Sequence, residues 1–143
     1  MLAGQLALIA AALFSGAAIY VIACEQPARL RLDDRALLAE WRSAYKRGTL
    51  MQAPLALIGA VLGALAWWQA GHWPWLAGAV VIVANWPYTL LVIKPVNDVL
   101  QATDPSQAGS NTRAMIERWG FLHGGRIALG VFATVLFLWA SLH

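Results

Sequence analysis

One short segment of the sequence carries side chains suited to acid–base and anion chemistry. Arg126 follows His123 by three residues, and Trp119 precedes His123 by four. In an α-helix this spacing places the three side chains along one face. Histidine ordinarily titrates closest to neutral pH, and arginine stabilises a developing negative charge. The segment therefore predicts a site in which His123 accepts a proton and Arg126 stabilises the resulting anion.

Other polar residues border the hydrophobic stretches of the chain and could join this site. Glu25 ends the first stretch and Gln52 lies near the start of the second. Asn97 and Asp98 follow the third stretch. We expect Glu25 to orient the proton-transfer groups and Asn97 to donate a hydrogen bond to a substrate. The predicted catalytic residues are His123, Arg126 and Glu25.

The same residues also fit a purely structural role. Arg126 would lie about 10 Å beyond Trp119 along a helix, a depth at which an arginine must snorkel or pair. Glu25 is its expected partner, because no base competes for it earlier in the sequence. An Arg126–Glu25 bridge would then fix the fourth helix to the first, with His123 bonded to a loop carbonyl. The sequence leaves both interpretations open.

The third hydrophobic stretch contains the sequence Asn-Trp-Pro-Tyr at residues 85–88. Pro87 should kink the helix and free a carbonyl group. Asn85 would either join two helices or line the deep end of a cavity. Trp86 and Tyr88 would offer flat walls to an aromatic ligand. The predicted substrate-binding residues are Asn97, Trp119, Gln52, Asn85, Trp86 and Tyr88.

The sequence gives little support for a metal or cofactor site. Cys24 is the only cysteine, which excludes dithiol chemistry and thiolate-rich metal sites. A set of His123, Glu25 and Asp98 would be incomplete for zinc or iron without further ligands. We expect no cofactor, and a metal at these three residues stays an alternative.

Four hydrophobic stretches must position all these side chains. The chain is 60% hydrophobic and 12% charged, with a mean hydropathy of +0.61. A helix that crosses a membrane needs roughly 20 mainly apolar residues. Stretches of that kind cover residues 2–24, 49–68, 75–93 and 119–142. None shows strand alternation. We predict an all-α integral membrane four-helix bundle, with residues 1–143 forming a single domain.

Basic residues are concentrated between the first and second stretches and between the third and fourth. The positive-inside rule places these loops in the cytoplasm and both termini outside. We expect a bacterial inner membrane, with lipids and a hydrophobic small molecule as partners. The bases adjoin the spans and alternate with acids, so we expect no nucleic-acid partner.

Several further features bear on packing. Segment 33–46 predicts a short cytoplasmic interfacial helix, and Trp41, Tyr45 and Trp119 should lie at the inner membrane boundary.

Small residues such as Gly59 and Gly63 could pack helices within the chain or in a homo-oligomer. The two halves show no residue-level match, so we expect no internal duplication.

Three short motifs resemble the anthrone oxygenase family, a class of small four-helix membrane proteins that mostly lack assigned functions. The motifs are Glu25-Gln26-Pro27-Ala28-Arg29, Ile93-Lys94-Pro95-Val96-Asn97 and the segment WGFLHGGR at residues 119–126. The resemblance extends over residues 17–142 and implies oxidation of an anthrone by O2 without metal, flavin or haem. A deprotonated anthrone is an electron-rich anion that reacts with O2 directly. A base that removes the proton and a cation that stabilises the anion would then be sufficient for catalysis.

Two functions of different classes follow. The leading hypothesis is a membrane-embedded oxygenase-like enzyme that admits a flat, apolar phenolic or quinonoid substrate from the lipid and deprotonates it at His123. The second is a non-catalytic membrane module that binds a lipid, a small hydrophobic ligand or a partner protein through the basic segment 29–47. A small transporter is disfavoured because no inverted repeat is visible. A shared fold does not deliver a shared reaction, so the resemblance does not choose between them.

Overall fold

Ten helical segments make up the computed structural model, which describes all residues 1–143. They are α1 Leu2–Tyr20, the π-helix η1 Val21–Glu25, α2 Gln26–Arg29, α3 Asp34–Ala70, α4 Trp73–Val83, α5 Asn85–Tyr88, the π-helix η2 Thr89–Ile93, α6 Lys94–Ala102, the short η3 Pro105–Gln107, and α7 Ser110–Leu142. Adjoining segments join into four long helices, each long and apolar enough to cross a membrane. The predicted all-α four-helix fold is confirmed.

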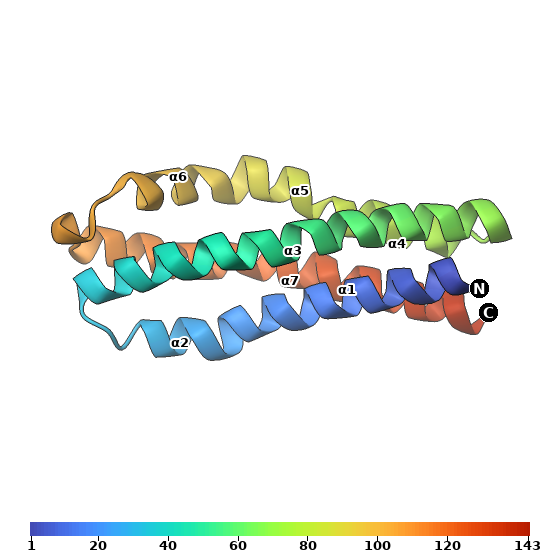
Figure 1. Cartoon of the computed structure of the whole chain (residues 1–143), viewed down its shortest axis with the longest axis horizontal. Coiled ribbons are helices and arrows are strands. Elements are labelled where there is room, and N and C mark those ends of the chain that lie inside the picture. The colour runs from blue at the N-terminus through green and yellow to red at the C-terminus, as the bar shows by residue number, and fades with distance from the viewer.

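The ends of α3 follow from local chemistry. The Asp33 side chain accepts a hydrogen bond from the backbone N–H of Ala36 at 2.9 Å, which caps the first turn. Gly71 ends the helix with φ 67°, a left-handed conformation that favours glycine. The turn at Gly71 lies at the same end of the bundle as both chain termini, and the two longer connections lie at the opposite end (Figure 1). We call these the terminal end and the loop end.

Segment 33–46 does not form the separate interfacial helix predicted from sequence. It is the first part of α3, which continues without a break for 37 residues. Its apolar residues Leu37, Leu38 and Trp41 are fully buried among α6 and α7 side chains. Burial inside the bundle removes this face from the membrane surface. Trp41 and Trp119 therefore belong to the core and not to a boundary belt.

Two apolar cores lie at different heights in the bundle. The core at the terminal end uses small residues and a few large rings, including Phe14, Trp75 and Phe137. Gly63 and Gly78 face the Phe137 ring, where an added Cβ would collide. Close backbone approach of this kind supplies contact energy where lipid gives no hydrophobic drive between helices. The core at the loop end is built from larger side chains, such as Leu37 and Trp41. Polar residues fill the layer between the two cores.

The helix from Trp73 to Ala102 is interrupted at the predicted kink. α4 ends at Val83, and α5 begins at Asn85 after a single residue outside the helix. Pro87 has no N–H, so it cannot bond the carbonyl of Val83. Figure 1 shows α5 and α6 out of line with α4. The interruption exposes side chains of this helix to the polar layer.

The two halves share a local pattern of residues around their π-helices, although no internal duplication is expected from the sequence. Each half has a tyrosine before a five-residue π-helix, a proline at the second position after it, and a buried polar residue two positions further: Tyr20, Pro27 and Arg29, then Tyr88, Pro95 and Asn97. The following helices carry Arg-Ala and, six residues after the Arg, a Trp: Arg35 and Trp41, then Arg113 and Trp119. The first and third long helices both run from the terminal end to the loop end, so the two occurrences of the pattern have the same orientation in the bundle and do not form an inverted repeat (Figure 1).

The prolines explain why the π-helices recur. A proline leaves the carbonyl four residues earlier without its usual partner. In both places the residue before the proline bonds five residues back instead, Gln26 to Val21 and Lys94 to Thr89. Such wide turns often lie at functional sites because they redirect neighbouring side chains. Here each of them borders a cavity.

Candidate functional site

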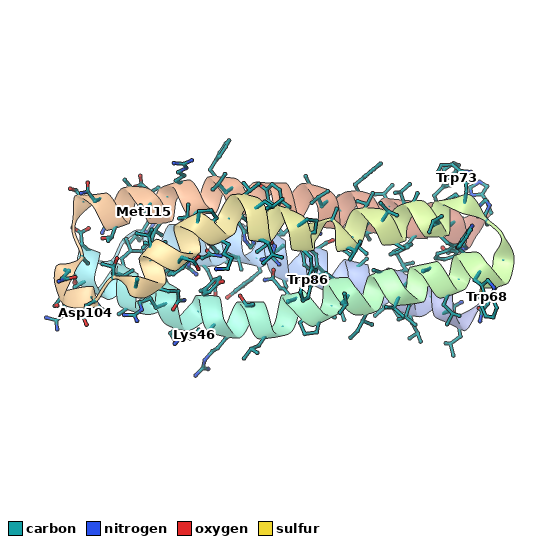
Figure 2. The ribbon with its side chains drawn as sticks, turned by 90° about the horizontal axis from the view of Figure 1, so that it is seen from above. Lys46, Trp68, Trp73, Trp86, Asp104 and Met115 are labelled. Atoms are coloured by element: carbon teal, nitrogen blue, oxygen red, sulfur yellow. The ribbon has the colours of Figure 1, made fainter.

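Two cavities lie in the polar layer between the apolar cores. The larger, which we call the main cavity, has a volume of about 830 Å³ and lies between α1, η1, α3 and α7. The smaller, the side cavity, has a volume of about 210 Å³ and lies between α3, α5, η2 and α6. Tyr45, Thr49 and Arg126 line both cavities and form their common wall. Figure 2 shows Trp86, from the side cavity, between Trp68 and Trp73 at the terminal end and Lys46 and Asp104 toward the loop end.

The two cavities collect most of the residues singled out from sequence. Those in the main cavity are Glu25, Gln52, Trp119, His123 and Arg126. Those in the side cavity are Asn85, Trp86 and Asn97. Tyr88 lines neither cavity, because its hydroxyl donates to the carbonyl of Leu122 at 2.6 Å and its ring packs against Gly125.

His123 is buried at the wall of the main cavity, next to the backbone of Ala18. Its side chain comes from the middle of α7, and the residue is 2% exposed. The ring of Trp119 lies against it at a centroid distance of 4.9 Å. Neither Nδ1 nor Nε2 makes a hydrogen bond, so the loop-carbonyl bond of the structural interpretation is not formed. Both nitrogens are buried and lack a hydrogen-bond partner.

Arg126 has no carboxylate partner, and the predicted Arg126–Glu25 bridge is wrong. The guanidinium instead lies over the Phe14 ring at 5.3 Å, and its Nε has no hydrogen-bond partner. Glu25 pairs with Arg29, one turn further along its own helix, at 2.9 Å. A partner on the same helix is always within reach at this spacing, whereas Arg126 lies on another helix. An unpaired cation at this depth is costly and calls for an anion.

Arg29 organises a network that the sequence analysis missed. The residue is 3% exposed and lies between two carboxylates, Glu25 at 2.9 Å and Glu40 at 3.0 Å. Its guanidinium also lies over the Trp119 ring at 5.7 Å. Glu25 makes no hydrogen bond to His123, so any orienting effect passes through Arg29 and Trp119. The Glu25–Arg29 spacing of four residues was the available signal, but it indicates a pair only if the first helix continues past its apolar stretch.

Tyr45 is a second residue that the sequence analysis placed elsewhere. Its ring stacks on Trp41 with a centroid distance of 5.0 Å and an interplanar angle of 9°. The amide Nδ2 of Asn97 donates to the Tyr45 hydroxyl at 3.2 Å. The hydroxyl proton is therefore free to point elsewhere, and Tyr45 faces both cavities next to Arg126.

The alternative metal set of His123, Glu25 and Asp98 does not assemble. Asp98 borders the side cavity and pairs with Lys94 at 2.7 Å, while the other two residues line the main cavity. No group of three or more His, Cys, Asp or Glu side chains is placed to hold one metal ion. What the layer offers chemically is an imidazole, an unpaired guanidinium and neutral hydrogen-bonding groups around a space open to a ligand.

Comparison with known proteins identifies the family to which the chain belongs. Neither the curated proteins nor the solved structures include a match. The sequence pattern of anthrone oxygenases, in contrast, matches residues 41–136, which contain the whole helix Trp73–Ala102, most of α3 and of α7, and both His123 and Arg126. With more than half of its length matched, the chain belongs to the anthrone oxygenase family.

Proposed function

We propose that the protein is a membrane-embedded oxygenase-like enzyme that acts on an apolar aromatic substrate of the anthrone, phenol or quinone type, with His123 as the base. One observation carries the proposal. The buried imidazole of His123 has two unpartnered nitrogens, and the unpaired Arg126 lies one turn away on the same cavity wall. A base next to a cation is the arrangement that forming and holding a carbon acid's anion requires.

The size and lining of the main cavity suit a flat aromatic molecule. Its volume of about 830 Å³ falls within the range usual for small-molecule sites. Trp119 and Tyr45 contribute flat aromatic surfaces to its wall. Tyr20 and Met51, which also line it, are among the exposed large side chains. We propose that the substrate passes between them from the lipid.

The proposed reaction needs only O2 as a second substrate. His123 takes a proton from the methylene carbon of an anthrone-type ring, and Arg126 stabilises the negative charge that moves onto the ring oxygen. The anion gives its electrons to O2 and forms a carbon–oxygen bond, which leaves a hydroperoxide after protonation. Loss of the second methylene proton with cleavage of the O–O bond yields the quinone carbonyl and water. One oxygen atom enters the product and the other leaves as water.

The orientation that we propose places the loop end in the cytoplasm of a bacterial cell, with the inner membrane around the bundle. Most basic residues lie toward the loop end, among them Arg31, Arg35 and Arg113. Basic groups next to a membrane span favour the cytoplasmic side and bind anionic lipid headgroups. The main cavity would then open within the cytoplasmic half of the bundle.

A non-catalytic module that binds a lipid or small hydrophobic ligand is the second candidate. It is supported by Arg47, an exposed cation at the edge of the main cavity, and by the unpaired Arg126 inside it. Together they could hold an anionic headgroup without any reaction. This candidate predicts ligand binding and no oxygen uptake.

Oxygen uptake by the purified protein in lipid nanodiscs distinguishes the two candidates. We expect consumption of O2 with anthrone or 1,8-dihydroxyanthrone at a rate well above autoxidation in empty nanodiscs. The quinone formed should equal the O2 consumed. Rates that never exceed autoxidation, over a pH series and a set of phenols, would exclude the oxygenase and leave the binding module.

A further inference from the structure

The side cavity contains two buried amide groups whose oxygens have no partner. Asn85 is 2% exposed and Asn97 is 1% exposed, and both line this cavity. The Oδ1 atoms of both residues lack a hydrogen-bond partner. Buried polar atoms are nearly always paired, and an unpaired one lowers the stability of the fold. The main-cavity chemistry proposed above does not use either of them.

The nitrogen of each amide already makes one hydrogen bond. Nδ2 of Asn85 donates to the carbonyl of Ile82 at 3.1 Å. A backbone carbonyl can only accept a hydrogen bond, so the nitrogen of this amide must face it. Nδ2 of Asn97 donates to the Tyr45 hydroxyl at 3.2 Å. The carbonyl oxygen of each asparagine, in contrast, lacks any partner, and this oxygen can only accept. A molecule that satisfies them must bring hydrogen-bond donors.

The shape of the cavity limits that molecule to about one ring. A cavity of about 150 Å³ in another protein is known to hold benzene, so the 210 Å³ here admits a single ring with small substituents. Trp86 forms one wall, and its indole N–H is already committed to the carbonyl of Ala53 at 3.2 Å. Lys94 at the edge is paired with Asp98 and is not a free cation.

The side cavity also adjoins the place where charge would develop. Arg126 and Tyr45 line both cavities, so the end of a molecule that contacts Arg126 in the main cavity lies next to the side cavity. The interruption at Ala84 and the π-helix η2 create this space, because they turn Asn85 and Thr89 toward α3.

We infer that the side cavity is a subsite for a ring that carries hydroxyl groups, and that Asn85 and Asn97 select phenolic donors at the end of the substrate remote from the reacting carbon. The inference rests on the proposed function for the identity of the reacting end. The preference for donors concerns binding alone and can be measured without turnover.

Two matched ligands test the preference in the full chain in nanodiscs. The first is 2,6-dihydroxyanthraquinone, at a pH that keeps its hydroxyls neutral, and the second is 2,6-dimethoxyanthraquinone. Neither has a methylene group to oxidise. Quenching of tryptophan fluorescence gives each Kd. We expect the wild type to bind the dihydroxy compound about fivefold to tenfold more tightly, the factor typical of one retained hydrogen bond.

Substitutions then assign the preference to the two asparagines. Asn85→Leu and Asn97→Leu should weaken binding of the dihydroxy compound about fivefold and leave the dimethoxy compound unchanged. Asn111→Leu, on an exposed position at the start of α7, is the control and should change neither Kd. Each folded variant is compared by its ratio of the two Kd values, which cancels a general loss of packing.

Two outcomes would overturn the subsite. One is equal affinity of the wild type for both ligands, a result that needs no variant to fold. The other is a preference that survives both asparagine substitutions. Failure of the oxygenase assay has a different signature, because no O2 is consumed while the preference for the dihydroxy ligand remains. In that case the subsite stands and the ligand is not an oxidation substrate.

Discussion

The carboxylate of Glu25 lies 2.9 Å from the guanidinium of Arg29, on the same helix, and not against Arg126. This pairing gives the buried Arg29 and the half-buried Arg126 different roles. Arg29 is neutralised by Glu25 and Glu40, whereas Arg126 has only an aromatic ring beside it. The stability of the bundle should therefore depend on Arg29, and the binding of an anion should depend on Arg126.

Replacement of Arg29 by methionine should strongly destabilise the fold. The change leaves two partly exposed carboxylates without the buried cation that lies between them, so their mutual repulsion is no longer compensated. Thermal unfolding in detergent measures the loss. Arg31→Met, on an exposed neighbour, serves as the control. Equal unfolding temperatures for the two variants would contradict the network around Arg29.

Arg126→Met should leave stability unchanged or raise it, because the substitution removes a half-buried cation that has no carboxylate partner. The same variant should bind anthraquinone-2-carboxylate at least about tenfold more weakly than the wild type, since a charge-assisted contact is lost. The exposed Arg118→Met variant is the matched control. A destabilisation as large as that of Arg29→Met would show that Arg126 has a structural partner after all.

His123→Gln should retain the fold and the ligand but lose most turnover. Proton transfer by a positioned side chain typically contributes about 10²–10⁴ in rate, and glutamine keeps the size and polarity of the side chain without the base. Oxygen consumption per folded molecule and the Kd of 2,6-dihydroxyanthraquinone are measured together. His143→Gln, at the C-terminus, should behave as wild type. If stability and ligand affinity fall together while turnover per folded molecule is unchanged, His123 has only a structural role in holding α7 in place.

The two glycines at positions 63 and 16 should respond differently to an added methyl group. A Cβ on Gly63 would lie 2.7 Å from the Phe137 ring, whereas one on Gly16 meets nothing within 4 Å. We expect Gly63→Ala to cost about 1–3 kcal/mol through overpacking and Gly16→Ala to cost nothing. Adding Phe137→Leu to Gly63→Ala should recover part of the loss. Unfolding temperatures of the three variants check this, and equal values would rule out the close packing of α3 and α7.

Reporter fusions test the orientation of the bundle. A reporter after His143 or in the turn at residues 70–74 should be active outside the cytoplasm, and a reporter in the loop at residues 102–111 should be active inside. The termini and the turn share one end of the structure, so the first two reporters must agree with each other (Figure 1). A cytoplasmic C-terminus would reverse the side from which the main cavity is reached.

Sequence alone was sufficient for the helices, because in lipid a backbone must satisfy its own hydrogen bonds and a run of roughly 20 apolar residues can do so only as a helix. It was also sufficient to indicate that Glu25, Gln52, His123 and Arg126 lie at a similar depth. Residues that border apolar spans on the same side reach the same layer whatever the packing. The depth of a residue in the bundle follows from its number of residues from the end of a helical span, because each residue adds a fixed rise, and this number is read directly from the sequence.

Tertiary structure decided which of these residues meet. Pairing of Arg29 with Glu25 depends on the first helix continuing through η1, and the exclusion of Tyr88 from both cavities depends on the glycine at position 125. Separation of Asn97 from His123 into neighbouring cavities depends on the rotation of each helix about its axis. Local sequence does not specify that rotation, because contacts between residues far apart in the chain determine it.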